Sequence, residues 1–317
     1  MAATRGGTGE VRAVIDVGTN SVKLLVADVE GKTVRPLHES SHQTRLGQGF
    51  YETHVLQAGA IEQTAKAVAD FAREAKNWSP AVVRVIATSA ARDAENKGDL
   101  ITALEAAAGG AQVEIISGNQ EADWAFKGVT SDPKLGAGPL LVMDVGGGSS
   151  EFILGADGRR IFAESAPMGS VRLLEKAGVS DPPTASERKR CEDEVRSVVE
   201  GRLKPNMEPA LRDLPGKIAL VATGGTSTIL ARMKLRLRSF NREMIEGTEI
   251  TREELSAEVT RLWSMRLEER KHLIGLPPNR ADVILTGSLI FHEVMAFFNL
   301  EVLRVSTRGL RFAALMN

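Results

Sequence analysis

One glycine-rich turn in the sequence brings together the residue types that phosphate chemistry needs. Asp144 ends an apolar run, residues 146–149 read Gly-Gly-Gly-Ser, and Glu151 begins the next apolar run. Glycines let a backbone approach phosphate oxygens without an intervening Cβ, and the N–H groups of such a turn can bind an anion beside a metal ion held by carboxylates. A plain hairpin would need one or two glycines but neither Asp144 nor Glu151, so the pattern favours a metal- and phosphate-binding turn.

The same turn occurs earlier in the chain. The segment VIDVGTNS, which begins at Val14, matches VMDVGGGS, which begins at Val142. Each copy starts with an apolar run, breaks at Asp-Val-Gly, resumes as a predicted strand, and turns again at a glycine followed by a basic residue. Two hairpins with the same residues at the same turn predict a duplicated domain. Taken alone, the first copy is equally consistent with a plain turn, because Gly18 is its only glycine.

Two further segments could contribute to a phosphate site. Gly224-Gly225-Thr226 follow a predicted strand and precede a predicted helix, whose N-terminus is a natural anion site, although a simple strand–helix connection explains the segment equally well. Glu121 follows Asn119, the expected N-cap of another helix, and so falls in the first helical turn. An acidic residue there is commonly a favourable partner of the helix dipole. Its place between the two glycine turns in the sequence makes Glu121 a candidate for catalysis as well.

Alternating helices and strands must position these residues. Periodicity and capping residues predict helices over residues 55–75, 98–110 (with Asp99 as N-cap), 184–203, 251–263 and 281–299. Short apolar runs predict strands over 82–89, 113–116 and the start of 217–225. This alternation indicates an α/β fold. The Gly- and Pro-rich loop over 130–139 is the expected boundary, which gives domains 1–130 and 131–305, with a C-terminal helix over 306–317 that could join the first domain.

The overall composition excludes several classes of protein. Apolar residues make up 43% of the 317 residues and charged residues 26%, which excludes wholesale disorder. The 40 Lys and Arg residues balance 41 Asp and Glu residues, so no global charge points to nucleic acid or a membrane surface. We find neither a secretory signal nor about 18 consecutive apolar residues. The single cysteine, Cys191, cannot form an internal disulfide, and we therefore expect a reducing, cytoplasmic location.

Eight segments, spread in order from residue 14 to residue 311, together resemble one family. They read VIDVGTNSVKLL, TSAARDA, IISGNQEA, MDVGGGSSEFILG, MGSVRL, TGGTSTILA, GLPPNRADVI and VSTRGLR. They are similar to the exopolyphosphatase/guanosine pentaphosphate phosphohydrolase (Ppx/GppA) family. The resemblance implies an α/β fold of two ribonuclease-H-like lobes, as in the actin-like ATPase and sugar kinase superfold, with an active-site cleft between the lobes. That fold agrees with the internal repeat.

The resemblance also implies roles for the matching residues. Glu121 would be the general base for the attacking water, and Arg92 would contact phosphate during catalysis. The acidic residues that hold Mg²⁺ or shape its site would be Asp144, Glu151 and Asp16. The phosphate-binding residues would be Gly18, Thr19, Asn20, Ser21, Gly146, Gly147, Gly148, Ser149, Gly224, Gly225 and Thr226.

The chain departs from the family pattern in two places. Family members usually read Glu-Glu-Ala-Arg where this chain has Gln120-Glu121-Ala122-Asp123, so a neighbouring acid and a base are replaced. The chain also stops soon after Arg311, without the further C-terminal helical domains of long family members. We therefore expect a short-form enzyme with weaker processivity on long polyphosphate.

Alternating cations at Arg232, Lys234, Arg236 and Arg238 have no role in the family pattern. On a strand the four side chains would line one face, whereas on a helix they would spread around the surface. A solvated basic surface and a track for a polyphosphate tail are both consistent with the sequence.

The resemblance implies an exopolyphosphatase, which hydrolyses the terminal phosphate of inorganic polyphosphate with Mg²⁺, and guanosine pentaphosphate (pppGpp) is another substrate of the same family. One alternative is an ATP-dependent small-molecule kinase of the same superfold, which would need separate nucleotide and acceptor pockets. The other is a non-catalytic polyphosphate or nucleotide sensor, which Gln120 and Asp123 make plausible. We expect no nucleic-acid or membrane partner, and the sequence leaves a homodimer open.

Overall fold

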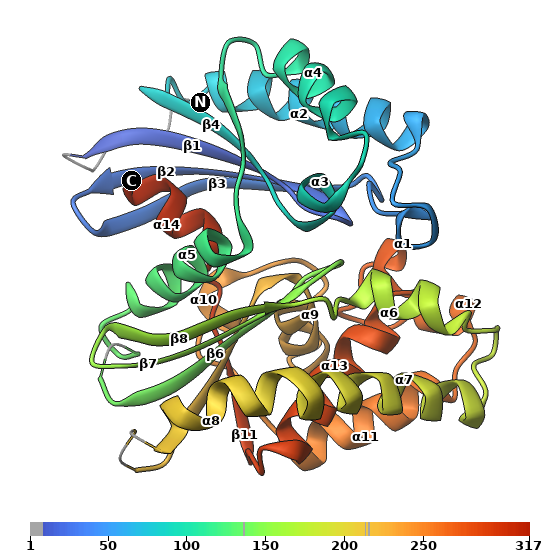
Figure 1. Ribbon diagram of the computed structural model, residues 1–317. Coiled ribbons are helices and arrows are strands. Elements are labelled where there is room, and N and C mark those ends of the chain that lie inside the picture. The colour runs from blue at the N-terminus through green and yellow to red at the C-terminus, as the bar shows by residue number, and fades with distance from the viewer. Residues whose placement is uncertain (1–8, 136, 213, 215) are drawn as a thin grey trace. The chain divides into compact units, whose positions relative to one another are not determined.

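A computed structural model describes residues 9–135, 137–212, 214 and 216–317 (Figure 1). It divides into two compact units: the chain up to Ser117 together with Arg311–Asn317 forms unit 1, and Gly118–Leu310 forms unit 2. The boundary therefore lies at Ser117 and not after residue 130, because helix α5 (Gly118–Thr130) packs on strands of unit 2. The C-terminal segment that joins unit 1 begins at Arg311 and not at residue 306.

Unit 1 is built on a five-stranded sheet with the strand order β3-β2-β1-β4-β5. The strands are β1 (Glu10–Val17), β2 (Ser21–Glu30), β3 (Thr33–Gln43), β4 (Val82–Ala87) and β5 (Gln112–Ile115). The helices are α1 (Phe50–Thr53), α2 (Ala58–Lys76), α3 (Ser89–Asp93), α4 (Lys97–Ala107) and most of α14 (Leu310–Met316). The first three strands form an antiparallel meander, and β4 and β5 continue the sheet in parallel beside β1.

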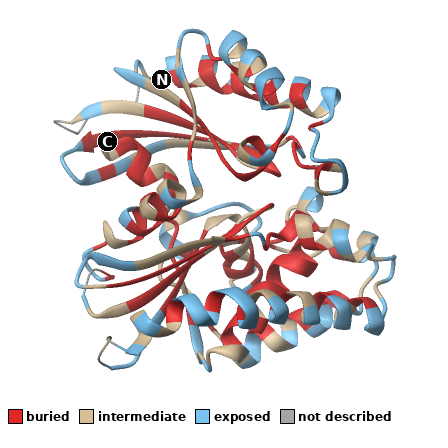
Figure 2. Ribbon diagram, in the orientation of Figure 1, coloured by how far each residue is buried: buried red, intermediate tan, exposed pale blue. Residues whose placement is uncertain are grey.

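Helix α2 packs against this sheet because its apolar residues recur on one face. Ile61, Val68 and Phe71 of that face are buried in the core of unit 1 (Figure 2). Helix α4 packs beside α2, and Asp99 lies in its first turn, so the expectation that Asp99 caps this helix was wrong. The N-cap is Asn96, whose amide bonds the backbone N–H and C=O of Leu56 at 2.8 and 3.0 Å.

Unit 2 is built on a six-stranded sheet with the strand order β10-β11-β9-β6-β7-β8. The strands are β6 (Pro139–Val145), β7 (Ser150–Ala156), β8 (Arg159–Ala166), β9 (Ala219–Thr223), β10 (Glu249–Thr251) and β11 (Val302–Val305). Besides α5, the helices are α6 (Ser170–Ala177), α7 (Ala185–Val198), the π-helix η1 (Val199–Leu203), α8 (Lys204–Arg212), α9 (Gly224–Lys234), α10 (Arg242–Ile245), α11 (Arg252–Trp263), α12 (Leu267–Lys271), the 3₁₀-helix η2 (Pro278–Arg280) and α13 (Ile284–Phe297). The three helices expected after residue 184 are present, and the first runs on through η1 into α8.

The two units repeat one hairpin geometry, which agrees with the predicted duplication. β1 lies between antiparallel β2 and parallel β4 (Figure 1). In the same way, β6 lies between antiparallel β7 and parallel β9. Each following hairpin shifts register once, between Val26 and Ala27 in unit 1 and between Leu154 and Gly155 in unit 2. Such a shift marks a β-bulge. The two bulges lie at matching positions after the Asp-Val-Gly turns, so the copies share their irregularities as well as their strands.

Candidate active site

Asp144 lies where two predicted turns of unit 2 meet, the second glycine turn (residues 146–149) and the third turn (residues 224–226). It faces Glu151 across the antiparallel β6–β7 ladder and Thr223 across the parallel β6–β9 ladder. Residues directly opposite across an antiparallel ladder have side chains on the same face of the sheet. A Cβ added at Gly224 would lie 2.1 Å from Asp144 Oδ1, and the φ of Gly224 is 91°, so a residue with a side chain does not fit there.

Glu151 is a buried carboxylate held by two hydroxyl groups. Glu151 is 2% exposed, and its Oε1 accepts hydrogen bonds from Ser149 Oγ at 2.9 Å and from Ser165 Oγ at 2.8 Å. Burial raises the pKa of Glu151 well above its ordinary value, the charges of Glu121 and Asp144 raise it further, and the two hydroxyl donors oppose the rise. The structure therefore brings the predicted base, Glu121, and two of the three predicted metal-binding acids, Asp144 and Glu151, into one electrostatic cluster.

These carboxylates fit a Mg²⁺ ion whose remaining ligands come from water and from the phosphate groups of a substrate. Among the described residues, no group of three or more His, Cys, Asp or Glu side chains forms a ready metal cage. Mg²⁺ does not require one, since it is commonly held by one or two carboxylates, several waters and phosphate oxygens. The mutual repulsion of Glu121, Asp144 and Glu151 is what a divalent cation would relieve. Asp144 and Glu151, which face each other across the ladder, are the residues that would hold the ion.

In the second glycine turn, the carbonyl oxygens accept hydrogen bonds from the protein, whereas two of the N–H groups donate none within the described residues. The Gly146 N–H closes the turn on the Ser149 carbonyl at 3.0 Å. The carbonyls of Gly146 and Gly147 accept the first N–H groups of α6 at 2.8–3.1 Å, and Arg172 Nε donates to the Gly148 carbonyl at 2.8 Å. The N–H groups of Gly147 and Gly148 have no acceptor within the described part of the chain. This arrangement can bind a phosphate oxygen.

The third turn is joined directly to the second. Gly224 and Gly225 open the 11-residue helix α9. Thr226 Oγ1 donates to the carbonyl of Val145 at 3.2 Å, one residue after Asp144. The N-terminal N–H groups of a helix favour an anion, and here they begin beside the Asp144 carboxylate.

In unit 1, the first turn repeats the hydrogen bonds of the second. The Gly18 N–H closes it on the Ser21 carbonyl at 3.0 Å, and the carbonyls of Thr19 and Asn20 accept N–H groups from residues 44–47 at 2.8–3.2 Å. Over the described residues, the N–H groups of Thr19 and Asn20 find no acceptor. This supporting loop, residues 43–49, is not predicted above. The sequence feature that marks it is a polar stretch with two glycines, QTRLGQG, directly after a predicted hairpin.

Asp16 has a different electrostatic setting from Asp144. Burial raises its pKa, but Lys23 and Arg311 oppose the rise. Lys23 is the residue that faces Asp16 across the β1–β2 ladder. The predicted acid of unit 1 therefore lies beside cations, whereas Glu151 of unit 2 lies beside the carboxylates of Glu121 and Asp144.

Arg92 lies at the same sheet edge of unit 1 as the first turn. It belongs to the short helix α3, which follows β4, and the Thr88 N–H just before that helix donates to the Val17 carbonyl at 3.2 Å. Arg92 Nη1 donates to the Ile116 carbonyl at 3.2 Å, and its Nε is 3.6 Å from Asp93 Oδ1. The side chain is 23% exposed, so part of the guanidinium can still meet an anion.

Glu121 is in the first turn of α5, as expected, but Asn119 does not serve as the predicted cap. The helix begins at Gly118, so Asn119 lies inside it. Its Oδ1 instead accepts a hydrogen bond from Arg160 Nη1 of β8 at 3.0 Å. Arg160 Nε also lies 3.7 Å from Asp123, and Lys127 Nζ lies 2.7 Å from it. Two cations, Arg160 and Lys127, thus lie beside Asp123.

The basic run over residues 232–238 begins in the last turn of α9 and continues beyond the helix, so it forms neither one strand nor one helix. Helix α9 ends at Lys234, and Arg236 has a left-handed φ of 54°. Arg232 Nη2 bonds the Arg238 carbonyl at 3.0 Å, and Lys234 Nζ pairs with Glu254 at 2.7 Å. The four side chains therefore do not form one continuous track, and Arg232 closes a loop within the protein.

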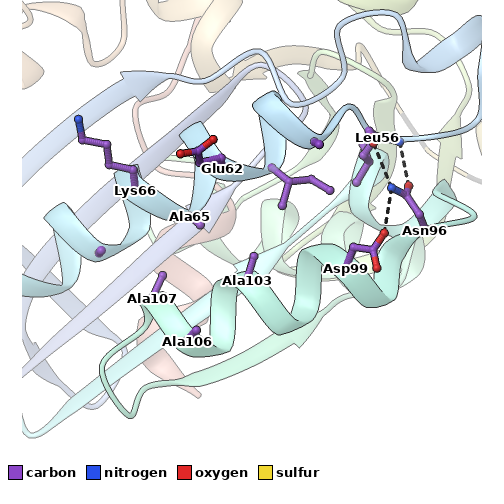
Figure 3. A pocket seen from close by; sticks show the side chains of 12 residues that line it. Leu56, Glu62, Ala65, Lys66, Asn96, Asp99, Ala103, Ala106 and Ala107 are labelled. Carbon is purple, nitrogen blue, oxygen red and sulfur yellow. Dashed lines mark hydrogen bonds between the residues drawn. The ribbon is translucent and has the colours of Figure 1, made fainter.

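A surface groove of unit 1 is lined by residues that the sequence did not single out as a binding site. It has a volume of about 790 Å³ and is formed by α2, α4 and the segments that precede them. Figure 3 shows that alanine side chains of the two helices line much of it, with Glu62, Lys66 and Asp99 around them. None of the residues predicted to bind phosphate or metal lines this groove among those that the structure describes.

Comparisons with known proteins point in one direction. A sequence model of the Ppx/GppA phosphatase family matches residues 25–316. A protein of Mycobacterium tuberculosis named exopolyphosphatase 2 is 36% identical over 293 residues, which cover 89% of each chain. Within the described residues, no helix combines the length and apolarity of a membrane span.

Solved structures agree with the fold. The crystal structure of an exopolyphosphatase-like protein superposes with a TM-score of 0.87 and 27% identity, and the match covers 97% of each chain. A Ppx/GppA family member of Aquifex aeolicus has a TM-score of 0.76 and 28% identity over 97% of this chain and 96% of its own.

Proposed function

This chain belongs to the Ppx/GppA phosphatase family, and from that premise we propose that it removes the terminal phosphate of inorganic polyphosphate by Mg²⁺-dependent hydrolysis. The observation that carries the proposal is the clustering of Glu121, Asp144 and Glu151 beside a turn with two N–H groups open to an anion. A relative that is named an exopolyphosphatase and shares 36% of its residues supports the choice of polyphosphate.

The chain would hold Mg²⁺ through Asp144 and Glu151. When bound, the ion would neutralise charge on the phosphate oxygens as the terminal group is transferred. The N–H groups of Gly147 and Gly148 would bind and orient the same kind of oxygen from the protein side. In unit 1, the N–H groups of Thr19 and Asn20 and the guanidinium of Arg92 would bind phosphate oxygens as well.

Glu121 would accept the proton of the attacking water. Such general-base catalysis typically contributes about 10²–10⁴-fold to the rate. The fold places Glu121 within the electrostatic reach of Glu151, while Arg160 bonds Asn119 and lies beside Asp123 in the same helix. The base is thus fixed on a helix whose first turn is attached to the neighbouring strand β8.

The test is phosphate release from polyphosphate, pppGpp and ATP, with and without Mg²⁺, by the wild type and by Glu121→Gln. We expect Mg²⁺-dependent release from polyphosphate that falls about 10²–10⁴-fold in the variant. Glu253→Gln is the matched control, because Glu253 is also an acid in the first turn of a helix of unit 2 but is exposed. Its rate should equal that of the wild type.

Other outcomes would change the proposal in different ways. Full activity of Glu121→Gln would remove the base assignment. Release from pppGpp alone would make the nucleotide the substrate. Tight polyphosphate binding without release from any of the three would favour the sensor.

A further inference from the structure

The carboxylate of Glu151 is held on one side only. Ser149 Oγ and Ser165 Oγ both donate to Oε1, at 2.9 and 2.8 Å. No residue in the described part of the chain donates to Oε2. One oxygen is thus saturated by hydroxyl groups, and the other remains for a ligand that is not part of the protein.

Ser165 reaches Glu151 because of the bulge in the β7–β8 hairpin. Gly155 pairs with Arg160, but Leu154 pairs with Phe162, so Ile161 is the extra residue. A Cβ at Gly155 would lie 2.3 Å from the ring of Phe126, so the glycine allows α5 to pack at this point. After the bulge, Glu151 faces Ser165.

Without the extra residue, the register would bring a different side chain to Glu151. An unshifted ladder from the Gly155–Arg160 pair would place Glu164 opposite Glu151, and two carboxylates would then face each other. The bulge replaces that repulsive pair by a hydroxyl donor. It also turns Glu164 toward a different set of partners.

The strand segment around Ser165 is fixed from its other side. Arg202 Nη2 donates to the Ser165 carbonyl at 3.2 Å, and Arg202 Nε also pairs with Glu164. Asn206 Nδ2 donates to the second oxygen of Glu164 at 3.1 Å. Arg202 lies in the π-helical turn η1, an irregularity that often marks functional sites. The hydroxyl of Ser165 is therefore presented by a segment with little freedom to move.

We propose that Ser165 is a positioning residue for the metal site: it fixes Glu151 through Oε1 so that Oε2 is the oxygen offered to a divalent cation. This inference rests on the proposed function, since it concerns the same cation. Groups that orient a metal ligand without touching the metal typically change metal affinity by about 10–100-fold when they are removed.

The test is Mn²⁺ binding, measured by electron paramagnetic resonance in the absence of substrate. Ser165→Ala and Ser165→Val remove the hydroxyl, whereas Ser165→Thr keeps it in a side chain of the same shape as valine. We expect the Ala and Val variants to bind Mn²⁺ about 10–100-fold more weakly and the Thr variant to stay close to the wild type. Ser288→Ala is the control, because Ser288 is a buried serine of the same unit whose hydroxyl, over the described residues, bonds only the Leu285 carbonyl of its own helix.

The outcomes separate this inference from the proposed function. Unchanged Mn²⁺ affinity in Ser165→Ala and Ser165→Val would overturn the positioning role, and so would a Thr variant as weak as Val, because the loss would then come from packing. A wild type that binds no Mn²⁺ would overturn the metal site and this inference together. If the wild type and the variants bind Mn²⁺ as expected but no polyphosphate is hydrolysed, the proposed function fails and the role of Ser165 stands.

Discussion

The two units carry the same turn with opposite charges beside it. In unit 2, Asp144 faces Glu151 across the first hairpin, and in unit 1, Asp16 faces Lys23 at the matching position. Both turns close with an N–H to carbonyl bond of 3.0 Å and leave the next two N–H groups open over the described residues. The two units thus share the backbone geometry of this turn, while one cross-strand residue sets the charge beside it.

The cross-strand residue, Lys23 or Glu151, gives the two aspartates different electrostatic surroundings. A carboxylate beside an ammonium group is neutralised by the protein itself. A carboxylate beside another carboxylate leaves negative charge that a divalent cation can neutralise. The resemblance grouped Asp16 with the metal-binding acids, but the charges around it lead us to predict that the metal is held by unit 2.

The largest effect is expected at Gly224, the glycine that lies against the Asp144 carboxylate. Gly224→Ala should lower the free energy of unfolding by more than about 1 kcal/mol, because its φ is left-handed and the new Cβ would overlap Asp144. Gly18→Ala in the first turn should cost less, since its Cβ would lie 3.2 Å from the Ser21 carbonyl oxygen. Urea denaturation of both variants checks the order, and equal losses would contradict it.

The second effect is a dependence of stability on pH in the metal-free protein. Because the pKa of Glu151 is raised in the folded state, that state keeps a proton that the unfolded chain has lost. Stability should therefore fall as the pH rises from the ordinary glutamate pKa through the raised one. Glu151→Gln removes this loss, so it should stabilise the protein at about pH 8 and not at about pH 4.

Asp16→Asn is the matched variant in unit 1. Its stabilisation at about pH 8 should be smaller than that of Glu151→Gln, because Lys23 and Arg311 already offset the burial of Asp16. Thermal unfolding in the presence of a chelator at both pH values measures the difference. A larger gain for Asp16→Asn would reverse the contrast between the units.

The smallest effect concerns Asp123, two residues after Glu121 on α5, and its ion pairs with Arg160 and Lys127. Asp123→Arg would place a third cation beside Arg160 and Lys127, so it should destabilise the protein, and adding Arg160→Asp should restore part of the loss. The side chains are partly exposed, and we expect a coupling of at most about 1 kcal/mol in a double-mutant cycle. Strictly additive losses would show that the pair does not interact.

Much of the fold and part of the candidate site could be predicted from the sequence, because these features are local. The repeated Asp-Val-Gly turns, the alternating strands and helices and the position of Glu121 in a first helical turn all follow from residues close in the chain. Partners brought by register or by packing could not be predicted in this way. Ser165 faces Glu151 only because one bulge shifts the ladder, and Asn119 bonds Arg160 instead of capping α5 because β8 packs beside it.

Mn²⁺ binding to Asp144→Asn and Asp16→Asn, two identical chemical changes at matching turns, shows directly which unit holds the metal. We expect Asp144→Asn to weaken Mn²⁺ binding strongly and Asp16→Asn to keep the affinity of the wild type. Loss of the cation in Asp16→Asn, with binding retained in Asp144→Asn, would assign the metal to unit 1, where Lys23 and Arg311 already lie beside the carboxylate, and would overturn the contrast between the units.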